Sequence, residues 1–271
     1  MKENVCSFIV NGQKTVGTLC LPDGTEKFPV VLLLHGFTGN RHESHSKSAP
    51  LGKFALLSSR LAEEGIASFR IDMRGSGESD GLFERMTAFT ELEDAIAACN
   101  YLKQCRLVDG DRISVLGLSF GGLIASSLCA IEDLKIRSLV LWNPAANMMQ
   151  VMMSVAGCEQ VQKACEDENK VYELEFWNSK RKLCGGFFTS LCKMSSHAAL
   201  QKYKGPLLLE IGLNDHVVWP EPAQAQGLLS CHDGEHELFT VNASHDFIDN
   251  GDDATLISVI EKAVTFLREH A

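Results

Sequence analysis

The sequence is short of positive charge. It contains 25 lysine and arginine residues against 35 aspartate and glutamate residues, so its formal net charge is −10 at pH 7. Phosphate backbones are bound by surfaces rich in lysine and arginine, and a nucleic-acid partner is therefore not expected. Hydrophobic residues make up 45% of the chain and charged residues 22%, which is typical of a folded protein and not of a disordered one.

Long hydrophobic runs are also missing. The longest candidates, such as residues 28–34, have the length of a β-strand and fall far short of the about 18 residues that span a bilayer. A signal peptide consists of an extended apolar stretch followed by a small-residue cleavage site. The first residues of this sequence contain neither feature. We therefore expect neither a membrane span nor a secretory leader.

Cysteine is plentiful, but its spacing includes no Cys-x-x-Cys pair. Ten cysteines are scattered through the 271 residues. An even number of cysteines indicates a disulfide framework only in a short secreted chain, whereas this chain is long enough to bury a core without cross-links. We interpret them as reduced thiols in a cytoplasmic protein. No predicted helix carries a His-x-x-x-His pair and no Cys/His ladder occurs, so neither a metal nor an organic cofactor is expected.

Short apolar runs alternate with helical patterns along most of the chain. Runs rich in Val, Ile and Leu predict strands at residues 29–35, 66–72, 113–117, 137–143, 206–212 and 237–243. Apolar residues at three- and four-residue spacing predict helices at residues 51–65, 91–105 and 252–269. Residues 5–10 and 16–21 flank Asn11 and Gly12 and predict a leading hairpin. This alternation predicts an α/β fold, in which helices cover both faces of a mainly parallel sheet.

One interval interrupts the alternation. About 60 residues separate the predicted strand that ends near residue 143 from the one that starts at 206, whereas a simple crossover needs a dozen or more. The interval is rich in Met and Phe, and we expect residues 145–204 to form a lid inserted into a core of residues 1–144 and 205–271. A helical subdomain that packs only its own core is the alternative. The sequence leaves open whether residues 171–177 form a helix or a hairpin.

A Gly-Leu-Ser-Phe-Gly segment at residues 117–121 directly follows a predicted strand and precedes an apolar helical pattern. This strand–turn–helix setting is that of a nucleophile elbow, in which a tight turn exposes the serine hydroxyl above the sheet at the positive end of a helix. A glycine-rich turn with an incidental serine is the alternative. The setting makes Ser119 the candidate nucleophile.

A serine hydroxyl needs an adjacent base, and the base needs an acid that orients it. Among the histidines, His245 follows the last predicted strand, and Asp215 follows the strand before it. Asp215 as a turn cap and His216 as a rival base are the alternatives, while His35 is expected to shape its own loop. The order Ser119, Asp215, His245 is the one expected of a fold in which the nucleophile comes first.

Negative charge that develops on a substrate carbonyl needs two backbone donors. The N–H of Phe120 directly follows the candidate nucleophile. The second candidate donor is the N–H of Phe37, in a loop after the first long strand that Gly36 and Gly39 allow to turn tightly. A phosphate-cradling role for these glycines is disfavoured, because neither G-x-G-x-x-G nor a P-loop pattern is present.

Several motifs together resemble the α/β-hydrolase superfamily over nearly the whole chain. They are His-Gly-Phe-Thr-Gly-Asn at 35–40, Asp-Met-Arg-Gly-Ser-Gly-Glu-Ser at 72–79, Leu-Gly-Leu-Ser-Phe-Gly-Gly at 116–122 and Asn-Pro-Ala-Ala at 143–146. Within the superfamily the sequence is similar to bacterial cinnamoyl and feruloyl esterases and related carboxylesterases. The resemblance implies ester hydrolysis through an acyl-Ser119 intermediate and an inserted lid that selects the acyl group.

The expected function is therefore a serine hydrolase that cleaves carboxylic esters, either of the cinnamoyl or feruloyl type or with short to medium acyl groups. Thioester or aminoacyl-amide hydrolysis with the same residues, and a non-catalytic binding protein, are the alternatives. The expected partner is a small-molecule ester, and neither the substrate-binding residues nor the oligomeric state follow from the sequence. A cluster of acidic residues after His245 is expected near the pocket mouth, where it would disfavour anionic substrates. These residues are Asp246, Asp249, Asp252 and Asp253.

Overall fold

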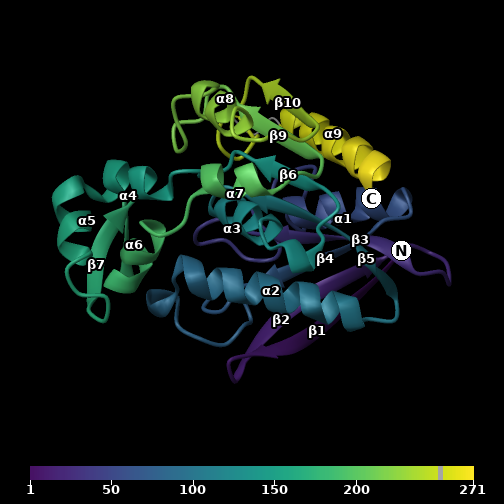
Figure 1. The fold of residues 1–271 in the computed structure, drawn as a ribbon, viewed down its shortest axis with the longest axis horizontal. Helices are drawn as coiled ribbons and strands as arrows, with labels where there is room; N and C mark the ends of the chain where they lie inside the picture. The colour runs from purple at the N-terminus through teal and green to yellow at the C-terminus, as the bar shows by residue number, and fades with distance from the viewer. Residues whose placement is uncertain (250–252) are drawn as a thin grey trace.

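The computed structural model describes residues 1–249 and 253–271. Within this part of the chain, eight strands form one central sheet in the order β1-β2-β4-β3-β5-β6-β9-β10 (Figure 1). Strands β4 to β10 of this order run parallel, and the hairpin β1-β2 joins them through an antiparallel pairing of β2 with β4. The strands are β1 Lys2–Val10, β2 Gln13–Leu21, β3 Phe28–Leu34, β4 Ala67–Asp72, β5 Val108–Leu118, β6 Leu139–Trp142, β9 Leu207–Gly212 and β10 His236–Val241.

Helices cover both faces of this sheet, as the alternating pattern predicts (Figure 1). The helices of the core are α1 Lys53–Glu63, α2 Ala88–Gln104, α3 Phe120–Cys129, α8 Ala223–Leu229 and α9 Ala254–His270, with short 3-10 turns η1 Phe83–Arg85 and η2 Glu132–Leu134. The α/β-hydrolase fold class is thereby confirmed. The predicted hairpin is also present, and its turn residues Asn11 and Gly12 have φ values of 49° and 81°, the left-handed conformation that a two-residue hairpin turn requires.

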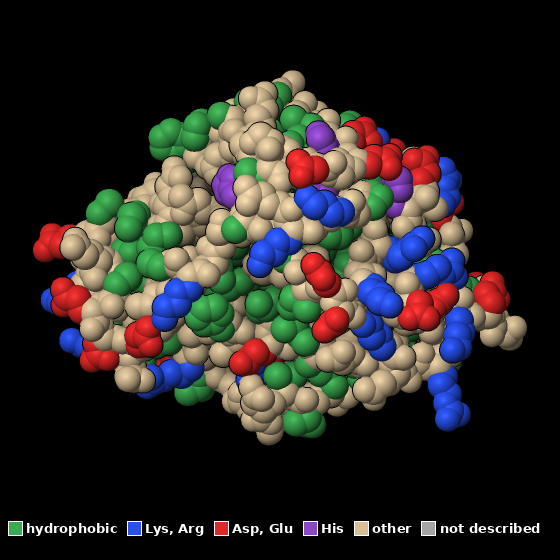
Figure 2. Space-filling view, viewed as in Figure 1, with side chains coloured by type: hydrophobic (Ala, Val, Ile, Leu, Met, Phe, Trp, Pro, Cys, Tyr) green, Lys and Arg blue, Asp and Glu red, His purple; other side chains and the backbone are tan. Residues whose placement is uncertain are grey.

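The predicted insertion, residues 145–204, contains four helices and a two-stranded hairpin. The elements are α4 Met148–Ala156, α5 Cys158–Ala164, β7 Val171–Phe176, β8 Ser179–Cys184, α6 Gly185–Leu191 and α7 Ser196–Lys202. Figure 1 shows α4, α5, α6 and β7 gathered beside one end of the core, and Figure 2 shows exposed hydrophobic side chains over the same end. Residues 171–177 thus belong to a hairpin and not to a helix.

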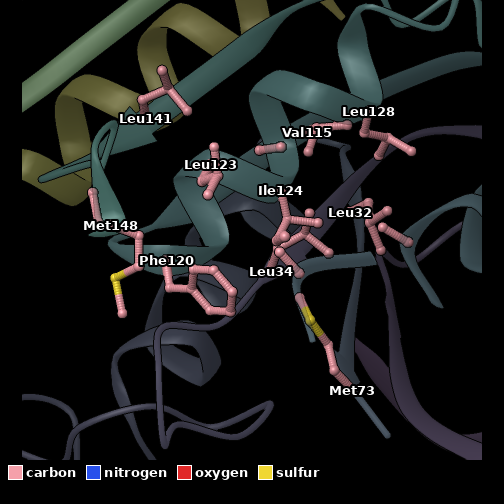
Figure 3. Close-up of a cluster of buried hydrophobic side chains, with 14 of the residues drawn as sticks. Leu32, Leu34, Met73, Val115, Phe120, Leu123, Ile124, Leu128, Leu141 and Met148 are labelled. Atoms are coloured by element: carbon pink, nitrogen blue, oxygen red, sulfur yellow. The ribbon is translucent and has the colours of Figure 1, made fainter. Parts of the chain in front are cut away.

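Each face of the sheet packs its own hydrophobic core, because side chains alternate along each strand. Leu32 of β3 packs with Ile124 and Leu128 of α3 on one face (Figure 3), whereas Leu33 contributes to the cluster that contains Phe54 of α1 on the other. The helices thereby hold the ends of the parallel strands in place. No helix of the described residues is long and apolar enough to cross a membrane, and all ten cysteines are free thiols.

Candidate active site

Ser119 is the single residue between the end of β5 and the start of α3, and its backbone angles are φ 54° and ψ −117°. A positive φ strains a residue that has a side chain, and such strain persists only where the surroundings enforce it. Here the Ser119 N–H donates to the carbonyl of Trp142 (2.9 Å), and the Ser119 carbonyl accepts from the N–H groups of Gly122 and Ala145 (2.9 Å each). A Cβ atom at Gly121 would collide with the backbone of β3. The turn therefore has the geometry of a nucleophile elbow.

Asp215 follows β9 and His245 follows β10, at the same edge of the sheet as Ser119. His245 Nδ1 lies 2.6 Å from Asp215 Oδ2. The other carboxylate oxygen, Oδ1, accepts from the N–H groups of Val217 (2.7 Å) and Val218 (2.9 Å), so both oxygens are held. Asp215 is buried, whereas the rival base His216 is exposed. The structure therefore pairs Asp215 with His245 and leaves His216 aside.

Asn143 fixes the backbone of His245, and the sequence analysis did not identify it. Its Nδ2 donates to the His245 carbonyl (2.8 Å), and its Oδ1 accepts from the N–H of Gly212 at the end of β9 (2.7 Å). The side chain is fully buried. One amide thus joins the ends of β6 and β9 to the loop that carries His245. In the sequence Asn143 was the first residue of the Asn-Pro-Ala-Ala motif at 143–146, with no role assigned to it.

Asp246, the neighbour of His245, is tied to the start of α1. Its Oδ1 accepts from Lys53 Nζ (2.6 Å) and from Ser44 Oγ (3.0 Å), and the Lys53 side chain is completely buried. Burial alone would raise the pKa of the Asp246 carboxyl, but the Lys53 ammonium outweighs it and holds this pKa below its ordinary value. The pair anchors the His245 loop to the start of α1.

Ser119 and His245 both line a cavity of about 450 Å³. The loop at residues 36–44 forms one wall, and the inserted segment contributes Met148, Val151 and Trp177. Val217 closes the side next to Asp215. These apolar side chains are the candidate substrate contacts that the sequence could not supply, because their convergence depends on how the insertion folds over the core.

The loop that carries Phe37 is held by Glu43. Glu43 Oε1 accepts from the N–H of Gly36 (2.6 Å), while the Gly39 N–H donates to the Gly36 carbonyl (3.0 Å). Within the described part of the chain, neither the Phe37 nor the Phe120 N–H has a hydrogen-bond partner. Both candidate oxyanion donors are therefore available. His35 lies buried under this loop, where its Nε2 accepts from the N–H of Met73 (3.1 Å).

The acidic residues expected near the pocket mouth do not all lie there. Asp246 lines the cavity, but Asp249 accepts from the N–H of Ser244 (3.0 Å) and Asp253 accepts from the Oγ of Ser46 (2.7 Å). Asp252 lies outside the described residues. Glu43 is a second carboxylate in the cavity wall, and among the described lining residues there is no lysine or arginine.

Comparison with known proteins identifies the family and the fold. The family model described as serine aminopeptidase, S33, matches residues 26–238, a span that includes Ser119 and Asp215 and ends before His245. The solved structure of Est1E from Butyrivibrio proteoclasticus with ferulic acid bound superimposes with a TM-score of 0.82 and 27% sequence identity, covering 98% of this chain and 98% of that chain.

Curated relatives match over shorter stretches. An uncharacterized 31.7 kDa protein of the traX-finO intergenic region of Escherichia coli is 33% identical over 123 residues, which is 45% of this chain and 40% of the relative. The quorum-quenching protein AidA of Acinetobacter baumannii is 28% identical over 116 residues, which is 42% of this chain and 35% of AidA. The alignments thus span less than half the length of these relatives. Because the family match covers most of the chain, this protein belongs to the serine aminopeptidase S33 family and is an α/β hydrolase.

Proposed function

We propose that this hydrolase is a serine carboxylesterase with Ser119 as nucleophile, His245 as base and Asp215 as orienting acid. The observation that carries the proposal is the 2.6 Å contact between Asp215 and His245, made at the cavity that also contains the strained Ser119. The proposal is also supported by position, since the candidate nucleophile, base and acid each follow a different parallel strand, at the edge of the sheet where ligands bind in such folds.

In the proposed reaction Ser119 Oγ attacks the ester carbonyl carbon while His245 Nε2 takes the hydroxyl proton. Asp215 keeps the Nδ1–H tautomer in place and stabilises the imidazolium ion. The oxyanion of the tetrahedral intermediate binds the N–H groups of Phe37 and Phe120. When the C–O bond breaks, His245 returns the proton to the leaving alkoxide. A water molecule, deprotonated by His245, then attacks the acyl carbonyl carbon, and His245 returns this proton to Ser119 Oγ as the acid leaves.

The cavity wall supports an apolar or aromatic acyl group as part of this proposal. Phe37, Met148, Val151 and Trp177 supply apolar contact area next to Ser119. The ferulic acid named for the Est1E structure is a ligand of this kind. We therefore include cinnamoyl or feruloyl esters and short to medium acyl esters as candidate substrates. Residues 145–204 would act as the lid, since Met148, Val151 and Trp177 of the cavity wall come from this segment.

A second candidate is hydrolysis of aminoacyl amides, which uses the same catalytic residues. The family description as serine aminopeptidase supports it. The carboxylate of Glu43 in the cavity wall also supports it, because a carboxylate attracts the ammonium group of an aminoacyl substrate. Activity on aminoacyl p-nitroanilides without activity on esters would favour this candidate over ours.

The test is a Ser119→Ala variant assayed on p-nitrophenyl butyrate. We expect the turnover rate to fall by a factor of about 10⁴ or more with the fold unchanged, because the hydroxyl forms the covalent intermediate. Ser127→Ala is the matched control, since the Ser127 hydroxyl only donates to the Leu123 carbonyl within α3 (2.9 Å). Retained activity in Ser119→Ala contradicts the assignment. Failure of the folded wild type to react with a fluorophosphonate would indicate a non-catalytic binding protein.

A further inference from the structure

Met148 lines two cavities. One is the catalytic cavity, and the other is a second cavity of about 300 Å³ between α3, α4 and the segment that joins α6 to α7. The second cavity is lined by apolar side chains from three directions, namely Leu123, Ala146, Met149, Leu191 and Met194. Met148 is the residue that the linings of the two cavities share. The side chain therefore forms a partition between them.

The partition is next to the reacting centre. Figure 3 shows Met148 beside Phe120 and Leu123, at the N-terminal end of the helix that follows Ser119. Met148 is the first residue of α4, and the Asn147 side chain caps this helix by accepting from the Gln150 N–H (3.2 Å). Its side chain is 2% exposed. The backbone is thus fixed, and the side chain is packed where the two cavities adjoin, with almost no accessible surface of its own.

Methionine suits a movable partition. It is unbranched and has three rotatable side-chain bonds, so it adopts another rotamer at lower cost than a branched residue. The second cavity offers further methionines, Met149 and Met194, as adaptable apolar walls. The lining also includes the polar residues Asn147, Cys192, Ser195 and His197. Two of these are engaged as helix caps, because Asn147 Oδ1 accepts from the Gln150 N–H (3.2 Å) and Ser195 Oγ accepts from the Ala198 N–H (3.3 Å). Leu123, Met149, Leu191 and Met194 thus give the space behind Met148 an apolar wall against which an acyl chain can pack.

We propose that the second cavity is an acyl-chain subsite and that Met148 controls access to it. This inference rests on the proposed esterase function. Acyl chains that end before Met148 bind within the catalytic cavity. Longer straight chains displace the Met148 side chain and place their distal carbons between Leu123 and Met194.

The test is a series of p-nitrophenyl esters from acetate to dodecanoate. One methylene in an apolar pocket changes kcat/KM by roughly 10- to 200-fold. We therefore expect Met148→Ala to raise the ratio of kcat/KM for decanoate to kcat/KM for butyrate at least tenfold. Met148→Leu, which preserves the buried volume with a stiffer side chain, is expected to lower the ratio. Met153→Ala is the control, because Met153 lies on the outward face of α4 and is 37% exposed.

A second substitution tests whether the gain comes from the second cavity. Met194→Trp fills this cavity from its far wall, and in the Met148→Ala background it should cancel the gain for decanoate while leaving butyrate hydrolysis in place. A Met148→Ala profile that changes equally at all chain lengths overturns the inference. So does a gain that survives Met194→Trp. Wild-type protein inactive on butyrate would instead overturn the esterase function itself, and the inference with it.

Discussion

Glu43 is the residue that decides which backbone N–H faces the cavity next to Ser119. Its Oε1 accepts from Gly36 (2.6 Å), so this N–H is not available to a substrate, while the adjacent N–H of Phe37 is. Glu43 itself has φ 62°, an uncommon conformation for a residue with a side chain. The carboxylate therefore positions the candidate oxyanion loop without taking part in the reaction.

We expect Glu43→Ala to lower kcat on p-nitrophenyl butyrate by a factor of about 10 to 10², with little change in KM. Loss of a whole oxyanion donor costs about 10² to 10³, and a misplaced donor costs less. Glu43→Gln retains an acceptor at the same place and should recover most of kcat. Steady-state kinetics of both variants, with the exposed Glu63→Ala as control, make the comparison. A rise in KM at constant kcat would contradict the positioning role.

At this scale the sequence predicted Ser119, Asp215 and His245, because each directly follows a strand and the carboxyl ends of parallel strands meet at one edge. Glu43 and Asn143 could not be predicted in the same way. Their roles depend on hydrogen bonds to backbone groups that come close only in the folded chain. A polar residue in a loop or at a strand end carries no periodicity that would distinguish such a role.

At the scale of the elements, the sequence predicted the sheet strands better than the insertion. Strand β5 begins at Val108, whereas the sequence predicted a start at residue 113. The prediction missed the first residues because Asp109 and Gly110 are uncommon in strands. A register shift against β3 accompanies this irregular start. The hairpin at 171–184 was ambiguous because β8 is a largely polar strand, with residues 179–182 exposed. Short helices such as α8 likewise lack enough turns for a clear periodicity.

The pairing of β6 with β9 buries a carboxyl group, and this burial favours its neutral form. Glu210 Oε2 accepts from Trp142 Nε1 (2.6 Å), Oε1 has no partner among the described residues, and the side chain is fully buried. Burial raises the pKa of Glu210 well above its ordinary value of 4.5, and the Trp142 hydrogen bond offsets only part of this effect. The folded state therefore holds this proton more tightly than the unfolded chain does.

Because the folded state binds this proton more tightly, we predict that the free energy of unfolding falls as the pH rises. The contribution of Glu210 is complete below about pH 4.5 and is lost as the pH rises toward its folded-state pKa. In that window each such group lowers the free energy of unfolding by up to about 1.4 kcal/mol per pH unit. Glu210→Gln stays neutral and should flatten this dependence. Burial also raises the pKa of Glu91, and it raises the pKa of Asp94 to about 6. The free energy of unfolding of Glu210→Gln should therefore still depend on pH, but less than that of the wild type.

Urea unfolding at pH 6 and pH 8 measures this effect. The difference between the two free energies of unfolding should be smaller in Glu210→Gln than in the wild type. Glu175→Gln is the control, since Glu175 is exposed on β7, away from the sheet strands that bury Glu210. Equal pH dependence in wild type and Glu210→Gln would show that Glu210 does not supply the slope.

At the scale of the whole molecule, the net charge of −10 predicts little by itself. Acidic and basic side chains are interspersed over the face shown in Figure 2, so the excess negative charge does not form one patch there. What matters for a substrate is which carboxylates the fold brings to the cavity. Asp249 and Asp253 were expected there, but neither lines the cavity. Asp249 accepts from the Ser244 N–H within its own loop, and Asp253 accepts from Ser46 and Ser48.

The cavity should therefore discriminate by charge, mainly through Glu43. Asp246 is balanced by Lys53, whereas Glu43 has no ion-pair partner among the described residues, and no described lining residue is a lysine or arginine. We expect kcat/KM for the p-nitrophenyl monoester of succinate to lie at least about tenfold below that for neutral p-nitrophenyl butyrate. Salt at 0.5 M should reduce this difference in kcat/KM by screening the charge, and Glu43→Gln should reduce it by removing the charge. Asp249→Asn should leave the gap unchanged. Equal rates on the two esters at low salt would contradict the prediction, because a negatively charged substrate cannot approach an unbalanced carboxylate without an energetic cost.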